Sequence, residues 1–415
     1  MCDTAVVVPL TGPVWFAKNS DREPSEAQFL ECHEGAESKA KPRGLPQTNG
    51  SARLLVSRPA WMWGCEMGVN EHGLAIGNEA VFTRLPVPEA GYTGMDFQRV
   101  ALATCRTADD ALDQLIELTE RLTQGGAMGH RHRTFRYHSS FLIADPTSAW
   151  VFETAGSYWA AKRVRGVATI SNALTIEDDF DRVHERAYAF ARERGWVKSH
   201  DFSFARAFSH RAMSLLAGAR IRRACTGRSL SGVREPETRD FILALTDHGH
   251  VEPGKGLRSE APCAHASWLP TRTSAQTTSS IIACLGESGP TVWATGTSAP
   301  CLSVFKPAPF DPELLPPRPV ADARFDEREL WWAHERLHRA CLLDYEGRRV
   351  KFAEDRERFQ DDCLRPGADA AHAWRTHRAS VDEWLHRVVR AKAPRAPTPA
   401  RWFWSRQSRA VSMPS

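Results

Sequence analysis

Cys2 carries two chemical groups that together can perform covalent catalysis. Its thiol is a nucleophile, and its nitrogen becomes a free α-amine once Met1 is removed, which the small cysteine side chain permits. An α-amine has a reference pKa of about 7.7–8.0, so near neutral pH it can accept the thiol proton. We therefore expect a catalyst whose nucleophile and general base belong to one amino acid.

A hairpin predicted from the first two dozen residues returns polar side chains to the end of the sheet that holds Cys2. Residues 5–10 are apolar and β-rich, a Gly-Pro turn follows, and a second strand begins at residue 14. Lys18, Asn19 and Asp21 lie at its far end and are expected to orient the amine and the substrate. The alternative is an idle or buried thiol at Cys2. A lipid anchor is disfavoured, because only Met1 precedes Cys2 and N-myristoylation requires glycine.

Asn78 follows a predicted hairpin with strands at residues 67–69 and 74–78. An amide at a strand end can donate a hydrogen bond to an oxyanion, and we expect Asn78 to do so. The alternative is an asparagine that caps a turn.

Asn172 and a run of arginines are further candidates. Four predicted strands between residues 139 and 171 end at Asn172, where the alternative is again a capping amide. A predicted helix over residues 203–219 precedes three arginines at positions 220–223. Arg223 fits a role in the site best and Arg220 second, whereas a solvated basic helix face is the alternative.

Composition limits the class of protein. The 415 residues are 42% hydrophobic and 25% charged, and no run approaches the ~18–20 apolar residues of a membrane span. The net charge is +4, but residues 391–415 contribute five basic and no acidic side chains, so +4 − 5 leaves about −1 for the rest. A nucleic-acid partner is therefore not expected. Ten cysteines without a C-x-x-C pair predict reduced thiols and a cytoplasmic location.

Three segments are predicted along the chain. Residues 2–310 contain the hairpins and form the expected catalytic domain, which a proline-rich linker at 307–319 follows. Residues 320–392 read as a C-terminal helical extension, and 393–415 as a flexible basic and aromatic tail that could bind a protein partner. By pattern alone the class is α+β, with hairpin-rich sheets and two or three helical layers.

His130, His132 and His138 are candidate ligands of a metal ion. No acidic or cysteine side chain has ligand spacing to them, and arginines surround them. This segment is better explained as a loop near the site, so no metal is expected there.

Several runs of the sequence resemble the secernin and dipeptidase family of N-terminal-nucleophile (Ntn) hydrolases. They include MCDTAVVVPL and WFAKNSDRE at the start, SRPAWMWGCEMGVNEHGLAIGNEAV at 57–81, and GTSAPCLSVFKP at 296–307. Together with GMDFQRVAL, FETAGSYWAAKRV, AQTTSSIIACL and LWWAHERLHRA, they span most of residues 2–345. The resemblance implies a four-layer αββα sandwich with a C-terminal helical extension.

The resemblance also implies roles for individual residues. Asn78 would lie at the oxyanion site, and Asn172, with Ser171 where relatives have threonine, would position substrate together with an arginine such as Arg223. Lys18, Asn19 and Trp63 would contact substrate. Lys18 replaces the arginine of the bile-salt-hydrolase branch and loses the bidentate fork, which argues against a bile-acid-like substrate.

The expected reaction is hydrolysis of dipeptides or similar small amides through a Cys2 thioester, without a metal or organic cofactor. One alternative is a non-enzymatic, secernin-like scaffold in secretion or exocytosis. Another is a linear-amide acylase of the penicillin or choloylglycine type. The chain could also form a homo-oligomer.

Overall fold

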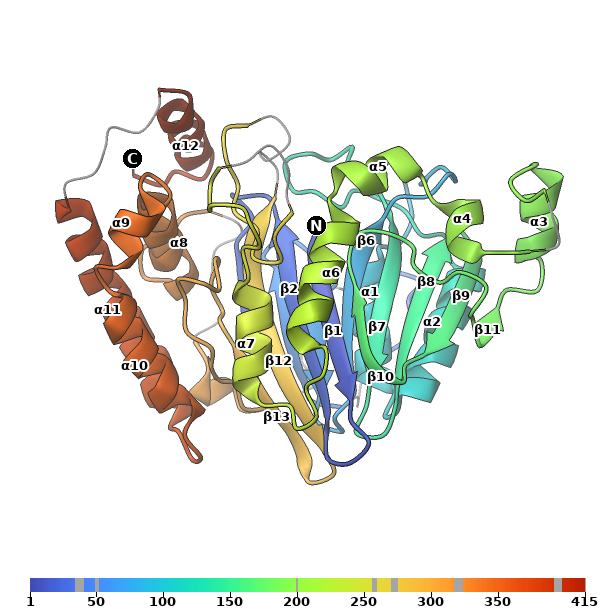
Figure 1. Cartoon of the computed structure of the whole chain (residues 1–415), viewed down its shortest axis with the longest axis horizontal. Coiled ribbons are helices and arrows are strands. Elements are labelled where there is room, and N and C mark those ends of the chain that lie inside the picture. Colours follow the sequence, from blue (N-terminus) through green and yellow to red (C-terminus); the bar gives the residue numbers. More distant parts are fainter. Residues whose placement is uncertain are drawn as a thin grey trace.

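The protein is described here by a computed structural model covering residues 1–33, 41–48, 52–198, 201–255, 260–269, 275–316, 324–391 and 398–414. Two antiparallel sheets dominate it, and they lie face to face, with β1 against β6 and β7 (Figure 1). The six-stranded sheet has the order β10(Gly166–Ile170), β1(Cys2–Val8), β2(Val14–Arg22), β12(Gln276–Gly286), β13(Gly289–Ala294) and β14(Lys306–Pro307). The eight-stranded sheet has the order β11(Arg182–Val183), β9(Tyr158–Arg163), β8(Ala149–Ala155), β7(His138–Ala144), β6(Ala75–Val81), β5(Met67–Asn70), β4(Leu54–Pro59) and β3(Gln28–His33).

Helices cover the outer face of each sheet. The helices α1(Gly94–Thr104) and α2(Ala108–Arg121) pack on strands β5 to β9, and α6(Ala219–Leu230) and α7(Thr238–Thr246) pack on the other sheet. Thr93 and Asp96 form a capping box that begins α1, and the Thr107 hydroxyl caps α2. The predicted α+β class and the order helix, sheet, sheet, helix are therefore confirmed.

Alternation along the first hairpin explains this layering. Val6 and Phe16 face the second sheet, whereas Ala5, Val7 and Trp15 face α6 and α7. Both faces of β1 and β2 are therefore buried. This explains why residues 5–8 and 14–17 are continuously apolar instead of alternating.

The helix predicted over residues 203–219 is wrong in extent. The chain instead forms α4(Phe204–Phe208), α5(Arg211–Leu216) and α6. Ser209, with an extended backbone, ends α4, and Gly218 adopts a left-handed conformation (φ 63°) between α5 and α6. The short helix α3(Ala187–Glu193) lies at the far end of the eight-stranded sheet (Figure 1).

The C-terminal helices gather beside β12 and β13 (Figure 1). They are α8(Leu330–Cys341), α9(Tyr345–Arg349), α10(Ala353–Leu364), α11(Ala370–Arg390) and α12(Thr398–Ala410). The expectation of a flexible tail is wrong for residues 398–410, which form α12. Phe403 and Trp404 are buried against Ala266 and Leu342, so the apolar stripe of this helix has an intramolecular partner. Among the described residues, no helix combines the length and apolar character needed to cross a membrane.

Candidate functional site

Cys2 lies at the start of β1, opposite Ser20 of β2. Its side chain is only 4% exposed, yet it lines a cavity of about 560 Å3. The backbone N–H of Asp21 donates to its Sγ at 3.4 Å. Met1 lines the same cavity, and its amino group donates to the carbonyl oxygen of Asp21 at 3.2 Å. Removing Met1 would therefore expose the Cys2 nitrogen and enlarge the cavity beside the thiol.

The backbone nitrogen of Cys2 is held by Asn172. It donates to Asn172 Oδ1 at 2.9 Å, and the Asn172 amide in turn donates to the carbonyl of Ala80 at 2.9 Å. Ser171 Oγ donates to the Cys2 carbonyl at 3.0 Å. These contacts form because β10 pairs with β1 and ends next to the N-terminal end of that strand. Asn172 thus lies at the nitrogen of Cys2, and its amide orients that nitrogen directly.

A buried ion cluster supports Asn172 from the helix side of the sheet. Arg222 of α6 binds Asp21 Oδ2 at 2.6 Å and also binds Asp3, and its Nη1 donates to Asn172 Oδ1 at 3.2 Å. Thr277 Oγ1 donates to the other oxygen of Asp21 at 2.7 Å. Burial raises the pKa of Asp3 to about 7, although Arg222 opposes the shift. One guanidinium therefore orders two carboxylates and the amide that holds Cys2.

The expectation that Arg223 faces the site is wrong, because the structure puts Arg222 there. Arg223 and Arg220 are exposed, and the Arg223 carbonyl accepts from Thr169 Oγ1 at 3.2 Å. Successive residues of a helix point about 100° apart, so an error of one position moves the side chain to another face. Ala219, Cys225 and Leu230 mark the buried face of α6 together with Arg222. The period of the predicted helix over 203–219 could not identify Arg222, because α6 starts anew after Gly218.

Lys18 lies between the two sheets rather than in the cavity wall. Its Nζ donates to the Asn78 carbonyl at 2.7 Å and to Glu79 Oε1 at 3.2 Å, and Thr4 also binds Glu79. Gly77 makes room for it, since a Cβ at that position would lie 2.5 Å from Lys18 Cδ. Burial alone would lower the pKa of Lys18, but Cys2, Glu79 and Glu66 raise it above its usual value. Lys18 therefore acts as a fixed positive charge next to the thiol.

The thiol of Cys2 does not ionise easily in this setting. Burial raises its pKa to about 12, and the charge of Lys18 and the chain amine only partly oppose the rise. A thiol with this pKa is protonated at neutral pH. A neighbouring base must therefore remove its proton before it can attack a carbonyl.

Asn78 is a buried amide with both polar atoms unpartnered among the described residues. By strand alternation it shares a face of β6 with Ala80, which lines the cavity. An unsatisfied buried amide costs roughly 1–3 kcal/mol, so its retention is consistent with a ligand that accepts its hydrogen bond.

Asn19 and Trp63, predicted to contact substrate, lie away from the cavity. Asn19 donates to the carbonyl oxygens of Leu245 and Pro262, because odd-numbered residues of this part of β2 face α7. Trp63 is packed in the core under α1, with Arg99 stacked 4.6 Å over its ring. Trp61, two positions earlier, is closer to the site, because its Nε1 donates at 2.9 Å to Glu26, which lines the cavity.

The cavity combines an acidic rim with an apolar wall. The ionisable side chains of its lining are Asp21, Arg22, Glu23, Glu26, Glu66 and His132. Its wall is built from Ala80, Phe82, Met128, Phe135, Tyr137, Met213, Leu216 and Ala217. Carboxylates outnumber guanidinium groups in this lining.

Arg22 organises the acidic rim and was not identified from the sequence. Its guanidinium binds Glu26 Oε2 at 2.6 Å, Glu66 Oε1 at 2.8 Å and the Met128 carbonyl at 2.8 Å. Arg339 of α8 supports the same region by donating to the Pro24 carbonyl at 2.8 Å. Only the alternation of β2, which turns Arg22 to the same face as Ser20, could have predicted its position.

The three histidines that are candidate metal ligands in the sequence, His130, His132 and His138, contact different partners. His132 Nδ1 contacts Glu23 at 2.8 Å, His130 stacks on Trp61 at 5.7 Å, and His138 Nδ1 contacts Thr83 Oγ1 at 2.9 Å. Each has its own partner, and they do not converge on a common point.

Comparison with known proteins gives a partial match. Residues 11–148, about a third of the chain, match the family described as acyl-coenzyme A:6-aminopenicillanic acid acyl-transferase. This segment includes Asp21 and Asn78 and excludes Cys2, Asn172 and Arg222.

The chain is also similar to distant solved structures. The C2A mutant of conjugated bile acid hydrolase from Clostridium perfringens is 13% identical, with a TM-score of 0.45, over 71% of this chain and 88% of that one. Penicillin V acylase from Agrobacterium tumefaciens is 12% identical, with a TM-score of 0.39, over 74% and 86%. The N-acylethanolamine-hydrolyzing acid amidase ortholog from Caenorhabditis elegans is 11% identical, with a TM-score of 0.38, over 69% and 93%. Similarity at this level assigns no activity to this chain.

Proposed function

We propose that this chain is a cysteine-type Ntn hydrolase that cleaves small amides with a free amine, dipeptides first among them. The observation that carries the proposal is the position of Cys2. Its sulfur meets a cavity, and its nitrogen is oriented by the Asn172 carbonyl oxygen at 2.9 Å. A buried thiol with a raised pKa needs a base, and removal of Met1 would free an amine on the same residue.

The reaction begins when whatever precedes Cys2 is removed. The freed amine accepts the thiol proton, and the thiolate attacks the substrate carbonyl to form a tetrahedral oxyanion. The proposed oxyanion donors are the Asp21 N–H, whose nitrogen lies 3.4 Å from the sulfur, and the Asn78 amide, which has no hydrogen-bond partner in the part of the chain that the structure describes. The amine then returns its proton to the leaving nitrogen. Water hydrolyses the resulting thioester and regenerates the thiol.

Asp21, Asn172 and Arg222 are proposed to orient the amine of Cys2. Asn172 accepts one hydrogen of the Cys2 nitrogen, and Arg222 holds both Asn172 and Asp21 in place. Such an arrangement keeps the nitrogen lone pair directed toward the sulfur. General-base catalysis of this kind contributes about 10²–10⁴-fold to a rate.

The acidic rim favours a substrate with an α-ammonium group. Glu23, Glu26 and Glu66 line the cavity, and Glu66 and Glu26 share the single guanidinium of Arg22. The cavity volume of about 560 Å3 falls within the ~300–1,000 Å3 typical of small-molecule sites. A dipeptide has the required cationic end, whereas an acyl chain does not.

A second candidate is an acylase or acyltransferase. The matched family is described as an acyl-transferase, and the wall of Phe82, Phe135 and Met213 could hold an apolar acyl group. The chemistry at Cys2 would be the same, and only the group delivered to the thiol would differ. Residues 2–310 would form the catalytic domain in either case, with 320–392 as a helical extension. Arg339 of this extension supports the segment after β2 by donating to the Pro24 carbonyl.

The test uses full-length protein with a cleavable N-terminal extension, so that exposure of Cys2 is controlled and verified by intact mass. Cleaved wild type should release amino acids from a dipeptide panel, and uncleaved protein should not. Cys2→Ala should abolish turnover. Cys284→Ser, which alters a partly buried thiol of β12 outside the cavity, is the matched control and should leave it unchanged.

Substrate variation separates the two candidates. N-acetylation of the dipeptide should remove activity if the acidic rim binds an ammonium group. Cys2-dependent turnover of N-acyl amino acids with none of dipeptides would instead identify an acylase. Absence of turnover of both panels by mass-verified Cys2-terminal protein would reject the hydrolase and leave a scaffold role.

A further inference from the structure

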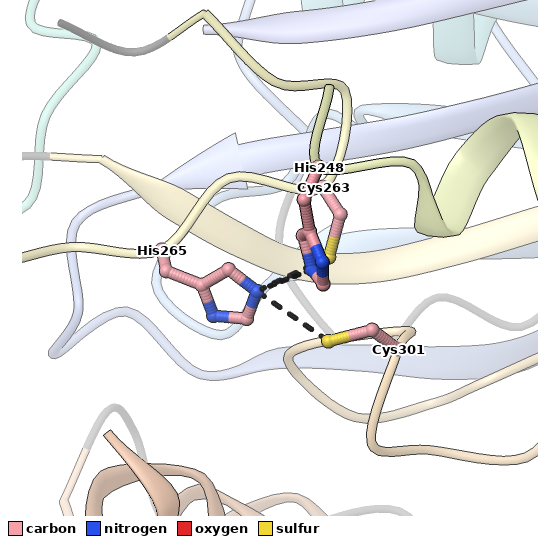
Figure 2. A group of neighbouring side chains, drawn as sticks. All are labelled: His248, Cys263, His265 and Cys301. Atoms are coloured by element: carbon pink, nitrogen blue, oxygen red, sulfur yellow. Dashed lines mark hydrogen bonds between the residues drawn. The ribbon is translucent and has the colours of Figure 1, made fainter. Parts of the chain in front are cut away.

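A second group of chemically reactive side chains lies outside the cavity of Cys2. His248 follows α7, Cys263 and His265 lie in the segment before β12, and Cys301 lies in the turn after β13 (Figure 2). One potential ligand atom from each of the four lies within 4.8 Å of all the others. Segments up to 53 positions apart therefore bring two thiols and two imidazoles to one point.

The three separations measured from His265 Nε2 match those between ligands of a tetrahedral metal ion. His265 Nε2 lies 3.2 Å from His248 Nε2, 3.3 Å from Cys263 Sγ and 3.4 Å from Cys301 Sγ. Tetrahedral zinc with Zn–N of about 2.0–2.1 Å and Zn–S of about 2.3 Å separates two nitrogens by about 3.3 Å, and nitrogen from sulfur by about 3.6 Å. The observed separations agree with these values.

A single tautomer of His265 cannot make all of these contacts as hydrogen bonds at once. His265 Nδ1 lies 2.8 Å from His338 Nε2, and His338 Nδ1 lies 3.1 Å from Glu335 Oε2. With its proton on Nδ1, a neutral His338 donates a hydrogen bond to the Glu335 carboxylate, and its Nε2 accepts one from His265 Nδ1–H. His265 Nε2 is left with one lone pair facing three partners, and a neutral imidazole nitrogen accepts through that single lone pair. A cation at the centre satisfies all four groups at once.

The same chain of contacts is the usual outer shell of a metal-binding histidine. Such a histidine donates the N–H of its other ring nitrogen to a carboxylate, a carbonyl or a similar acceptor, which fixes its tautomer. Here Glu335 ends the series of hydrogen bonds that runs from His265 through His338. Its carboxylate accepts hydrogen bonds from Gln276, Ser298 and Arg339. His265 is thus rigidly oriented with Nε2 toward the cluster.

We infer that His248, Cys263, His265 and Cys301 bind a zinc ion as a closed structural site. Two thiolates and two imidazoles are a zinc donor set, and four protein ligands leave no open position for substrate. A cavity of about 250 Å3, lined by His248 and Cys301, provides a route of entry for the ion. This inference is independent of the proposed function, because zinc content is measured without an activity.

The site would also hold the segment that orients Asp21. Between the two ligands of this segment, Ala264 donates its N–H to Thr277 Oγ1 at 2.9 Å. The Thr277 hydroxyl in turn donates to Asp21 Oδ1 at 2.7 Å. Beside the ligands, the Pro262 carbonyl accepts from Asn19 at 3.0 Å. Zinc therefore fixes one side of the network around Cys2 without touching the cavity.

The test measures metal in full-length protein purified under reducing conditions after growth with added zinc. Wild type should contain about one zinc per chain, and X-ray absorption should give two sulfur and two nitrogen neighbours. Cys301→Ser should lose most of the zinc at equal protein concentration. Cys284→Ser is the matched control, since both thiols are partly buried, and should keep it.

A spectroscopic measurement on wild type covers the case in which Cys301→Ser does not fold. Cobalt(II) added to chelator-treated, reduced protein should give tetrahedral d–d bands and a thiolate charge-transfer band. Wild type without zinc and without these bands would overturn the inference. Zinc retained fully in Cys301→Ser, or a Cys263–Cys301 disulfide found in freshly purified protein by mass spectrometry, would overturn it as well.

Discussion

The side-chain oxygen of Asn172 accepts a hydrogen bond of 2.9 Å from the backbone nitrogen of Cys2, 170 positions away in the chain. The same oxygen accepts from Arg222 at 3.2 Å. An amide that is itself fixed by a buried guanidinium can hold the nitrogen in one orientation. This relationship links the nucleophile to the ion cluster on the opposite face of the sheet.

Substitution at Asn172 should separate orientation of the amine from binding of the substrate. Asn172→Ala should lower kcat about 10²-fold with little change in KM, because the lost contact acts on the proposed base. Asn172→Asp keeps the oxygen but adds a negative charge, which stabilises the ammonium form of the amine. The acidic limb of its pH–rate profile should therefore move to higher pH. An unchanged profile in Asn172→Asp would contradict the assignment of the amine as base.

Arg222 and Arg223 are adjacent but should respond oppositely to substitution. Arg222→Met removes the partner of the buried Asp3 and Asp21 carboxylates, which should cost about 3–5 kcal/mol in unfolding free energy. Arg223→Met alters an exposed side chain and should stay within about 0.5 kcal/mol of wild type. Urea unfolding measures both. Equal destabilisation by the two variants would contradict the orientation of α6.

Gly64 permits the chain to pass close to the start of α1. A Cβ at Gly64 would lie 2.6 Å from the Met95 carbonyl carbon and 2.7 Å from the Asp96 nitrogen, both backbone atoms. Gly64→Ala should therefore destabilise the protein by about 1–3 kcal/mol. Gly227→Ala, within α6, is the control. A Cβ at Gly227 would lie 3.4 Å from Thr169 Oγ1 of β10, which is close to ordinary contact. This variant should be neutral or stabilising by up to about 1 kcal/mol, as measured by thermal unfolding.

Glu31 should make the protein sensitive to acid. Burial opposes its ionisation, but His33 and Arg58 lower its pKa from the usual 4.5 to about 2. Its folded pKa is below its unfolded pKa, so its contribution is complete above pH 4.5 and is lost as the pH falls from 4.5 to 2. The shift corresponds to about 3 kcal/mol. Denaturant unfolding between pH 2 and 6 should show this loss.

Glu31→Gln provides the comparison for that pH dependence. It should be less stable at pH 6, because Arg58 keeps a buried charge without its carboxylate, and its stability should fall less steeply in acid. Glu346→Gln removes an exposed partner of Arg349 and should follow the wild-type curve. A Glu31→Gln curve parallel to wild type would refute the role of Glu31.

The N-terminal hairpin shows how far the sequence reaches. The apolar run and the Gly-Pro turn predict β1 and β2 correctly, and with them the nearness of Asp21 to Cys2. Side chains on alternate faces of β2 were not distinguished, however, so Asn19 was predicted in the site and Arg22 was not.

Residues distant in the chain were assigned only by the tertiary structure. Trp63 and Trp61 belong to one aromatic run, yet one is packed under α1 and the other borders the acidic rim. The α12 segment looks like a polar and aromatic tail until Ala266 and Leu342 are seen to cover Phe403 and Trp404.

By itself, the sequence determined the layered α+β class, most of the strands, and the choice of Cys2 as candidate nucleophile and base. These follow from periodicity and turn chemistry, which act over a few residues. The tertiary structure alone decided that Arg222 serves the site and that His248, Cys263, His265 and Cys301 meet. Such meetings depend on how helices and loops pack across two sheets, and packing is a property of the whole chain rather than of any short stretch.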